Sequence, residues 1–234
     1  MKAKRGDLKD KVNFLKILKV FSKDELPKTF MIFYAVGLLL YIIPFSRPLF
    51  VALTPLSLFF VTLLVVRHHK KIDFNFIIFS VIVVVSSFFI EVIGVRSGEL
   101  FGSYRYLPTL GPGIMDTPVV IGINWLMLTY CSASIANVLI KKSEVITGYV
   151  LKIITGAAIM VIYDLVVEMV APAMGMWQFE TPYPPVRNFI MWFIISLTFH
   201  SLLHLFKIKA TGKPAISLFV LQIIFFLLVF LVNL

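Results

Sequence analysis

Four carboxyl side chains occupy stretches of the chain that are otherwise apolar. Glu91, Asp116, Asp164 and Glu168 lie in or beside runs long enough to cross a membrane, and Asp164 and Glu168 are four residues apart. That spacing places both on one face of a helix. An ionisable group costs at least about 2.5–3.5 kcal/mol at the centre of a bilayer, so it indicates a functional site, a hydrogen-bonded clamp between helices, or a side chain that reaches to the headgroups.

Other catalytic chemistries have less support in the sequence. His200 and His204 have the i,i+4 spacing of a metal pair, but they lie at the opposite end of their span from the acids, and interfacial hydrogen bonding is the favoured role. The glycines at 94, 98 and 102 lack the context of a dinucleotide site, and no serine and histidine form a recognisable nucleophile motif. We therefore expect no metal and no cofactor. Acid–base chemistry by carboxyl groups on an apolar substrate, or passive transport, remains.

The composition indicates which elements carry these residues. Of 234 residues, 59% are hydrophobic and 15% are charged, against about 25% charged in soluble proteins, and the mean hydropathy is +0.96. A soluble enzyme, a disordered chain and a nucleic-acid-binding domain are excluded, so no nucleic-acid partner is expected. The chain is predicted to be an all-α polytopic transmembrane helix bundle.

Seven stretches are long and apolar enough, or nearly so, to span a bilayer as helices of about 20 residues. The first is the weakest, because it is short and is closed by Pro44 and Pro48. Residues 1–27 are expected to form a basic cytoplasmic segment, and residues 28–234 a single transmembrane helical domain. The predicted spans are residues 28–45, 49–66, 74–95, 117–140, 147–170, 189–206 and 214–233.

Positive charge alternates between the two sides of the predicted spans. Of 22 Lys and Arg, 18 lie on the side of the N-terminus and 4 on the other. By the positive-inside rule the N-terminus is cytoplasmic and the C-terminus outside, which an odd number of spans requires. The net charge of +10 thus reflects topology in an integral membrane protein, expected in a bacterial inner membrane. Six of the twelve acids, including the four above, fall in the outer half, which favours a site there.

Two blocks of residues in the outer half resemble a known family. The first reads Glu91-Val-Ile-Gly-Val-x-Ser-Gly-x-x-Phe-Gly-x-Tyr-x-Tyr, followed by Asp116-Thr-Pro and Ile-Gly-Ile-Asn124-Trp125. The second reads Tyr163-Asp164-x-x-x-Glu168, then Ala171-Pro, Trp177 and Pro185-x-x-Asn188-x-x-x-Trp192. Over roughly residues 30–230 the chain resembles the carotenoid biosynthesis membrane-protein family, whose characterised members are bacterial carotenoid 1′,2′-hydratases and the archaeal bisanhydrobacterioruberin hydratase. It departs from the family pattern at Ser103, where Asn is frequent, and at Leu107, where Gly is usual.

The resemblance implies an enzyme that adds water across the terminal double bond of an acyclic carotenoid end group, forming a tertiary alcohol without a redox cofactor. Such a reaction needs a neutral carboxylic acid, aromatic faces near the cation, and a group that holds water. We expect the proton donor and the water-orienting base among Asp116, Asp164 and Glu91, with Glu168 as partner or helix clamp. Arg105 or Arg187 could instead pair with one of these acids. The candidates for contact with substrate or water are Tyr104, Tyr106, Asn124, Trp125, Trp177, Asn188 and Trp192.

Two other classes of function stay open. A non-enzymatic carotenoid or lipid carrier, or a small proton-coupled transporter, would also place acids in the membrane, although the sequence shows no internal repeat. A carotenoid end-group cyclase would use the same first protonation while excluding water. A prenyl transferase is disfavoured because Asp-rich magnesium motifs are missing from the sequence. The expected partners are a membrane-dissolved carotenoid, the lipid bilayer and other carotenoid-pathway enzymes.

Overall fold

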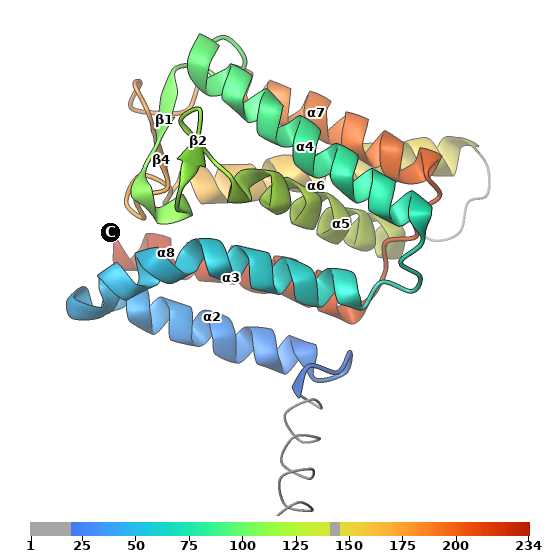
Figure 1. Ribbon diagram of the computed structural model, residues 1–234, viewed down its shortest axis with the longest axis horizontal. Helices are drawn as coiled ribbons and strands as arrows, with labels where there is room; N and C mark the ends of the chain where they lie inside the picture. Colours follow the sequence, from blue (N-terminus) through green and yellow to red (C-terminus); the bar gives the residue numbers. More distant parts are fainter. Residues whose placement is uncertain (1–19, 141–145) are drawn as a thin grey trace, which may run out of the picture.

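The computed structural model describes residues 20–140 and 146–234, which form a bundle of antiparallel helices (Figure 1). The chain runs back and forth between the two ends of the bundle, and its C-terminus lies at the end that carries short strands. The charge pattern predicts that this end faces outside, and we call it the outer end. The helices are α2 (Leu26–Ile42), α3 (Arg47–Arg67), α4 (Phe74–Ser97), α5 (Val120–Leu139), α6 (Ile146–Glu168), α7 (Val186–Leu205) and α8 (Lys213–Val232), with single 3₁₀ turns at Pro44–Ser46 and Pro108–Leu110. Most of the predicted 1–27 segment lies outside the described residues.

Five stretches are helical, long and apolar enough to cross a membrane, which indicates an integral membrane protein. They are Pro44–Arg67, Phe74–Ser97, Ile146–Glu168, Val186–Leu205 and Lys213–Val232. A helix stands at each of the seven predicted positions, but α2 is shorter, with 17 residues, and α5 is not among the five. Five of the seven predicted spans thus have the length and composition of membrane helices, and the all-α architecture is confirmed for the described residues.

Helix α5 occupies the centre of the bundle and contacts α3, α4, α6, α7 and α8. Most of its side chains are buried against these helices, so little of its surface is left to face lipid. Its hydroxyl groups are satisfied internally, since Ser132 Oγ donates to the Leu128 carbonyl and Ser134 Oγ to the Tyr130 carbonyl. Helix α5 therefore packs mainly against protein, whereas the surrounding helices keep large exposed apolar surfaces.

Two glycines allow the central helices to approach their neighbours closely. A Cβ at Gly122 of α5 would overlap the backbone carbonyl of Val84 on α4, and one at Gly156 of α6 would overlap the ring of His200 on α7. Small residues at helix crossings are typical of packing in membranes, where close backbone contact replaces the hydrophobic effect. These crossings bring together α4, α5, α6 and α7, which carry most of the polar site described below.

Two short β pairs cover the outer end of the bundle. β1 (Tyr104–Tyr106) pairs antiparallel with β4 (Trp177–Phe179), which places Tyr106 opposite Trp177 and Tyr104 opposite Phe179. This pair ties the loop between α4 and α5 to the loop between α6 and α7. β2 (Gly113–Ile114) and β3 (Thr117–Pro118) form a separate hairpin within the first of these loops.

Asp116 is expected in or beside the apolar run of the fourth predicted span, and the structure places it outside helix α5. Asp116 lies in the turn of the β2–β3 hairpin, is exposed, and precedes the first residue of α5 by four positions. Met115 and Asp116 have φ of 54° and 64°, and Asp accepts this left-handed conformation more readily than most residues. Because Thr117 and Pro118 pair in β3, the helix starts only at Val120.

Candidate functional site

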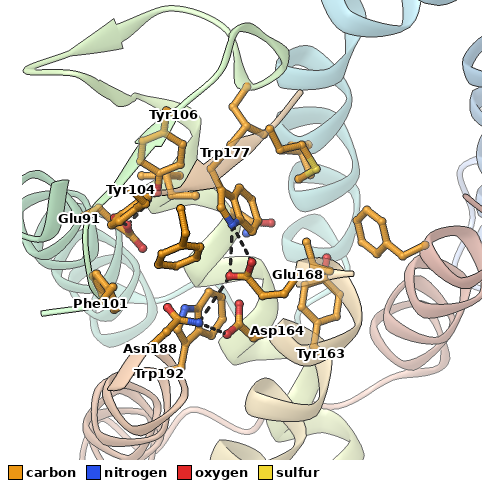
Figure 2. Close-up of a pocket in the computed structure, with 18 residues that line it drawn as sticks. Glu91, Phe101, Tyr104, Tyr106, Tyr163, Asp164, Glu168, Trp177, Asn188 and Trp192 are labelled. Carbon is orange, nitrogen blue, oxygen red and sulfur yellow. Dashed lines mark hydrogen bonds between the residues drawn. The ribbon is translucent and has the colours of Figure 1, made fainter. Parts of the chain in front are cut away.

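Three carboxyl side chains converge at the outer end of the bundle (Figure 2). Glu91 comes from the last two turns of α4, and Asp164 and Glu168 come from the last turns of α6. Glu91 is 4% exposed and Asp164 is 1% exposed, whereas Glu168 is half-buried. All three line one cavity, which we call the acid cavity.

Glu91 accepts hydrogen bonds from three side chains. The hydroxyl groups of Tyr104 and Tyr106 donate to Glu91 Oε2 at 2.6 and 2.7 Å, and Trp125 Nε1 donates to Oε1 at 2.9 Å. The antiparallel pair with β4 holds β1, and alternate residues of a strand share a face, so both tyrosines reach the same oxygen. Three donors and no acceptor around the carboxyl group are the surroundings that stabilise an ionised carboxylate.

Asp164 and Glu168 have a different set of partners. Asn188, in the first turn of α7, donates from Nδ2 to Asp164 Oδ2 at 2.8 Å and lies 3.5 Å from Glu168 Oε1. Trp177 Nε1 donates to both oxygens of Glu168 at 3.2 Å. Asp164 Oδ1 is buried and has no hydrogen-bond partner among the described residues. Asp164 is therefore the carboxyl of the three with the fewest donors.

The acid cavity has a volume of about 50 Å³. A buried water requires at least about 10–15 Å³ and two to four polar partners, so the cavity has room for water beside its carboxyl groups. Asn124 and Asn188 also line it. The rest of the wall is aromatic and aliphatic, as Figure 2 shows for the rings around the acids. The arrangement is an acid–base site in an apolar setting.

The aromatic side chains around the cavity pack on one another in fixed orientations. Trp192 stacks on Trp125 with ring centroids 4.2 Å apart, and Trp177 meets Tyr106 edge-on. Burial, and next the neighbouring Glu91, raise the pKa of the Tyr104 and Tyr106 hydroxyl groups well above the ordinary value. Both phenols therefore remain protonated donors at any physiological pH.

The structure brings together all but one of the residues that the sequence singles out. Glu91, Asp164 and Glu168 surround the acid cavity with the predicted contact residues Tyr104, Tyr106, Asn124, Trp177, Asn188 and Trp192, and Trp125 reaches it through its bond to Glu91. Asp116 is separated from them. It lines a surface hollow that shares Tyr104 and Tyr106, but none of the three acids, with the acid cavity.

Several wall residues escape sequence reasoning. Leu58 of α3 and Phe226 of α8 line the acid cavity, yet each is one apolar residue within an apolar run and carries no distinguishing signal. Tyr163 also lines it, and its position beside Asp164 in the second block is a signal that could have found it. Its hydroxyl donates to Gln222 Oε1 on α8 at 3.2 Å.

The alternative in which an arginine neutralises one of the acids is not seen. Arg187 Nη2 donates to the Gly98 carbonyl at 2.9 Å, and within residues 20–140 and 146–234 neither it nor Arg105 forms an ion pair. In the same residues no group of three or more His, Cys, Asp or Glu side chains is placed to hold a metal ion.

Fold and site together define a polytopic membrane protein with a buried carboxyl cluster near one face of the bilayer. Residues 50–234 match the family model described as carotenoid biosynthesis protein. The chain therefore belongs to the carotenoid biosynthesis protein family, and this membership suggests a pathway enzyme. No curated protein and no solved structure gives a significant match. Helix α2 precedes the matched region.

Proposed function

We propose that the protein is a cofactor-independent hydratase that adds water to the terminal double bond of an acyclic carotenoid end group. The observation that carries this proposal is that the buried acids of one cavity receive different numbers of hydrogen-bond donors. Glu91 is surrounded by three donors, whereas Asp164 retains a buried oxygen without a partner. One acid is thus suited to carry charge and another to carry a proton.

Asp164 is the proton donor in this proposal. A carboxylate buried without sufficient donors is costly, because an isolated charge loses its hydration, and burial of the neutral carboxylic acid costs much less. Asp164 receives one hydrogen bond, on Oδ2 from Asn188, which leaves Oδ1 to hold the proton. Protonation of an alkene requires a neutral acid whose O–H group can reach the double bond in the acid cavity.

The reaction consumes one alkene and one water and regenerates the acid. The Asp164 proton bonds to the less substituted carbon of the terminal double bond, and the alkene π electrons form that C–H bond. A tertiary cation is left on the adjacent carbon. The oxygen of a water forms the new C–O bond, and the proton lost from that water returns to the Asp164–Glu168 pair. The product is a tertiary alcohol, and no electrons are exchanged with a redox partner.

Glu168 and the two asparagines are suited to hold the attacking water. Glu168 is half-buried, its carboxyl already accepts from Trp177 on the outer side, and Asn124 and Asn188 line the same cavity. A carboxylate that accepts the water proton also acts as the general base of the step. Asn188 lies within hydrogen-bonding distance of both α6 carboxyl groups and holds them close together, so that the proton can return to Asp164.

The cation intermediate would form among aromatic faces and near a negative charge. Trp177, Trp192 and Tyr106 line the cavity, and a cation over such rings gains about 0.5–2 kcal/mol each. Glu91, ionised by its three donors, adds a fixed negative charge at the same cavity. It is a stabilising group in this scheme and not the acid.

The test is expression in a host that accumulates lycopene, with pigments analysed by mass. Wild type should yield a product heavier by one water, and Asp164→Asn should lower conversion about 10²–10⁴-fold, the usual contribution of a general acid. Asp116→Asn is the matched control, because Asp116 is exposed and outside the acid cavity, and it should retain wild-type conversion. A cyclised isomer of unchanged mass would identify a cyclase instead. Unchanged pigment with well-folded wild-type protein would refute the hydratase assignment for this substrate.

A further inference from the structure

A second cavity lies beside the acid cavity, between α2, α3 and α8. Its volume is about 170 Å³, and we call it the apolar cavity. In Figure 1 these three helices lie side by side below the helices that carry the acids. Its wall includes Phe33 and Gly37 of α2, Leu53 and Ser57 of α3, and Phe225 of α8, and none of its lining residues is charged.

The two cavities are separated by a single layer of side chains. Leu58, Met176 and Phe226 line both of them. Beside this layer, Tyr163 of the acid cavity bonds to Gln222, which lines the apolar cavity. Met is the most adaptable apolar side chain, and all three members of the layer are side chains rather than backbone. A rotamer change in this layer would therefore connect the two cavities without movement of a helix.

The apolar cavity also reaches the lipid-facing surface. Val36 of α2 and Leu53 of α3 line it, and their side chains are 49% and 39% exposed. Large apolar side chains exposed on the same two helices, such as Ile32 and Leu56, indicate that this surface faces the bilayer. An opening between α2 and α3 would therefore receive its ligand from the membrane and not from water.

We propose that the apolar cavity is the channel that binds the hydrocarbon chain of the substrate, entered from the bilayer between α2 and α3. The end group passes the layer formed by Leu58, Met176 and Phe226 and reaches Asp164, while the rest of the chain lies among the rings of α2 and α8. This inference rests on the proposed function for the identity of the reacting group. The absence of charge from the lining selects a hydrocarbon over a polar lipid headgroup.

The channel can be filled at Gly37 without touching the acid cavity. A Cβ at Gly37 has one neighbour within 4 Å, a ring carbon of Phe225 at 3.8 Å, which is ordinary contact, so Gly37→Leu would extend into the cavity. Ala35→Leu is the matched control, because Ala35 is an exposed small residue on the same helix and does not line the cavity. Ser57→Leu fills the opposite wall and serves if Gly37→Leu fails to fold, as judged by its melting temperature.

The experiment uses the full chain in detergent with two probes. Lycopene binding is followed by the circular dichroism induced in its visible band, and hydration is measured on lycopene and on farnesol, which carries the same isopropylidene end on a short chain. Gly37→Leu should weaken lycopene binding about tenfold, as expected from displacing roughly two methylene contacts. It should lower kcat/KM for lycopene to the same degree and leave kcat for farnesol within about twofold, a change too small to report lost transition-state contacts. Ala35→Leu should change none of these.

The outcomes separate the channel from the chemistry. Wild-type lycopene binding by a folded Gly37→Leu or Ser57→Leu protein would overturn the channel, whatever the activity. Hydration of farnesol by wild type without any binding of lycopene would overturn it as well. A third outcome is that wild type binds lycopene but hydrates neither probe, and that Gly37→Leu loses this binding. That result would support the channel and refute the proposed hydratase.

Discussion

The proposed roles of the buried acids, with a proton on Asp164 and a charge on Glu91, require Glu91 to be ionised. A substitution at Tyr104 offers a way to measure this. Tyr104→Phe removes one O–H donor to Glu91 Oε2 and keeps the ring that packs against Phe101 and Phe179. The same change in a Glu91→Gln background removes a donor to a neutral amide oxygen. The difference between the two backgrounds isolates the charge on Glu91.

The magnitudes follow from the type of hydrogen bond that is lost. A bond to a charged group contributes about 1.5–3 kcal/mol and one to a neutral group about 0.5–1.5 kcal/mol. Tyr104 is buried and its bond to Glu91 is 2.6 Å long, so solvent does not screen the interaction. We therefore expect Tyr104→Phe to cost about 1.5–3 kcal/mol in wild type and about 0.5–1.5 kcal/mol beside Gln at position 91.

Thermal melting of the detergent-solubilised protein is the assay. For a chain of this length 1 kcal/mol corresponds to about 2–4 °C, so Tm should fall by about 3–12 °C in wild type and about 1–6 °C in the Glu91→Gln background. Tyr183→Phe is the control and should leave Tm unchanged, because the Tyr183 side chain is 81% exposed. Equal losses of Tm in the two backgrounds would show that Glu91 is neutral. The assignment of the proton to Asp164 would then lose its basis.

Three further changes probe a helix crossing, a residue of the acid cavity and the cap at the start of α4. Gly122→Ala should cost about 1–3 kcal/mol of stability, measured as a lower Tm, because its Cβ would overlap the Val84 carbonyl; an unchanged Tm would contradict the close α4–α5 crossing. Asn188→Leu should lower Tm and abolish hydration, since removal of the single donor to the buried α6 aspartate leaves a polar group unsatisfied at a cost of about 1–3 kcal/mol; retained hydration would exclude Asn188 from the proposed mechanism. Asp73 is the N-cap of α4, and the hydrogen bond that its side chain accepts from the Phe76 amide lowers its pKa below the ordinary value of 3.8. The cap therefore stabilises α4 at pH values above 3.8, and this contribution is lost as the pH falls through the lowered pKa. Tm of wild type should therefore drop more steeply with acid than Tm of Asp73→Asn, and parallel curves would contradict the cap.

Much of the bundle could be predicted because membrane insertion imposes a simple rule on sequence. A run of about 20 apolar residues satisfies its own backbone only as a helix, so the apolar runs predict helices at all seven positions. Apolarity alone does not say whether a helix faces lipid or protein. Helix α5 is such a case, because five neighbouring helices bury most of its side chains although its apolar run resembles those of the other helices.

The acid cluster was predictable for the same reason, and Asp116 shows the limit of the reasoning. Glu91, Asp164 and Glu168 are conspicuous because charge in an apolar run is costly. Asp116 stands at the edge of such a run, where hydropathy does not distinguish the start of a helix from the turn of a hairpin. The turn is set by local backbone conformation, and the positive φ of Met115 and Asp116 has no signature in hydropathy.

Hydropathy and charge alone thus predict helices, an orientation in the membrane and the residues for which burial is expensive, because each of these is a local balance between a side chain and the membrane. Which hydrogen bonds each acid receives is a different matter. Tyr104, Trp125 and Asn188 come from three separate elements, and only their packing decides that Glu91 receives three donors and Asp164 receives one. The apolar cavity likewise exists only where α2, α3 and α8 fail to fill the space between them, and no single apolar run records the shape of its neighbours.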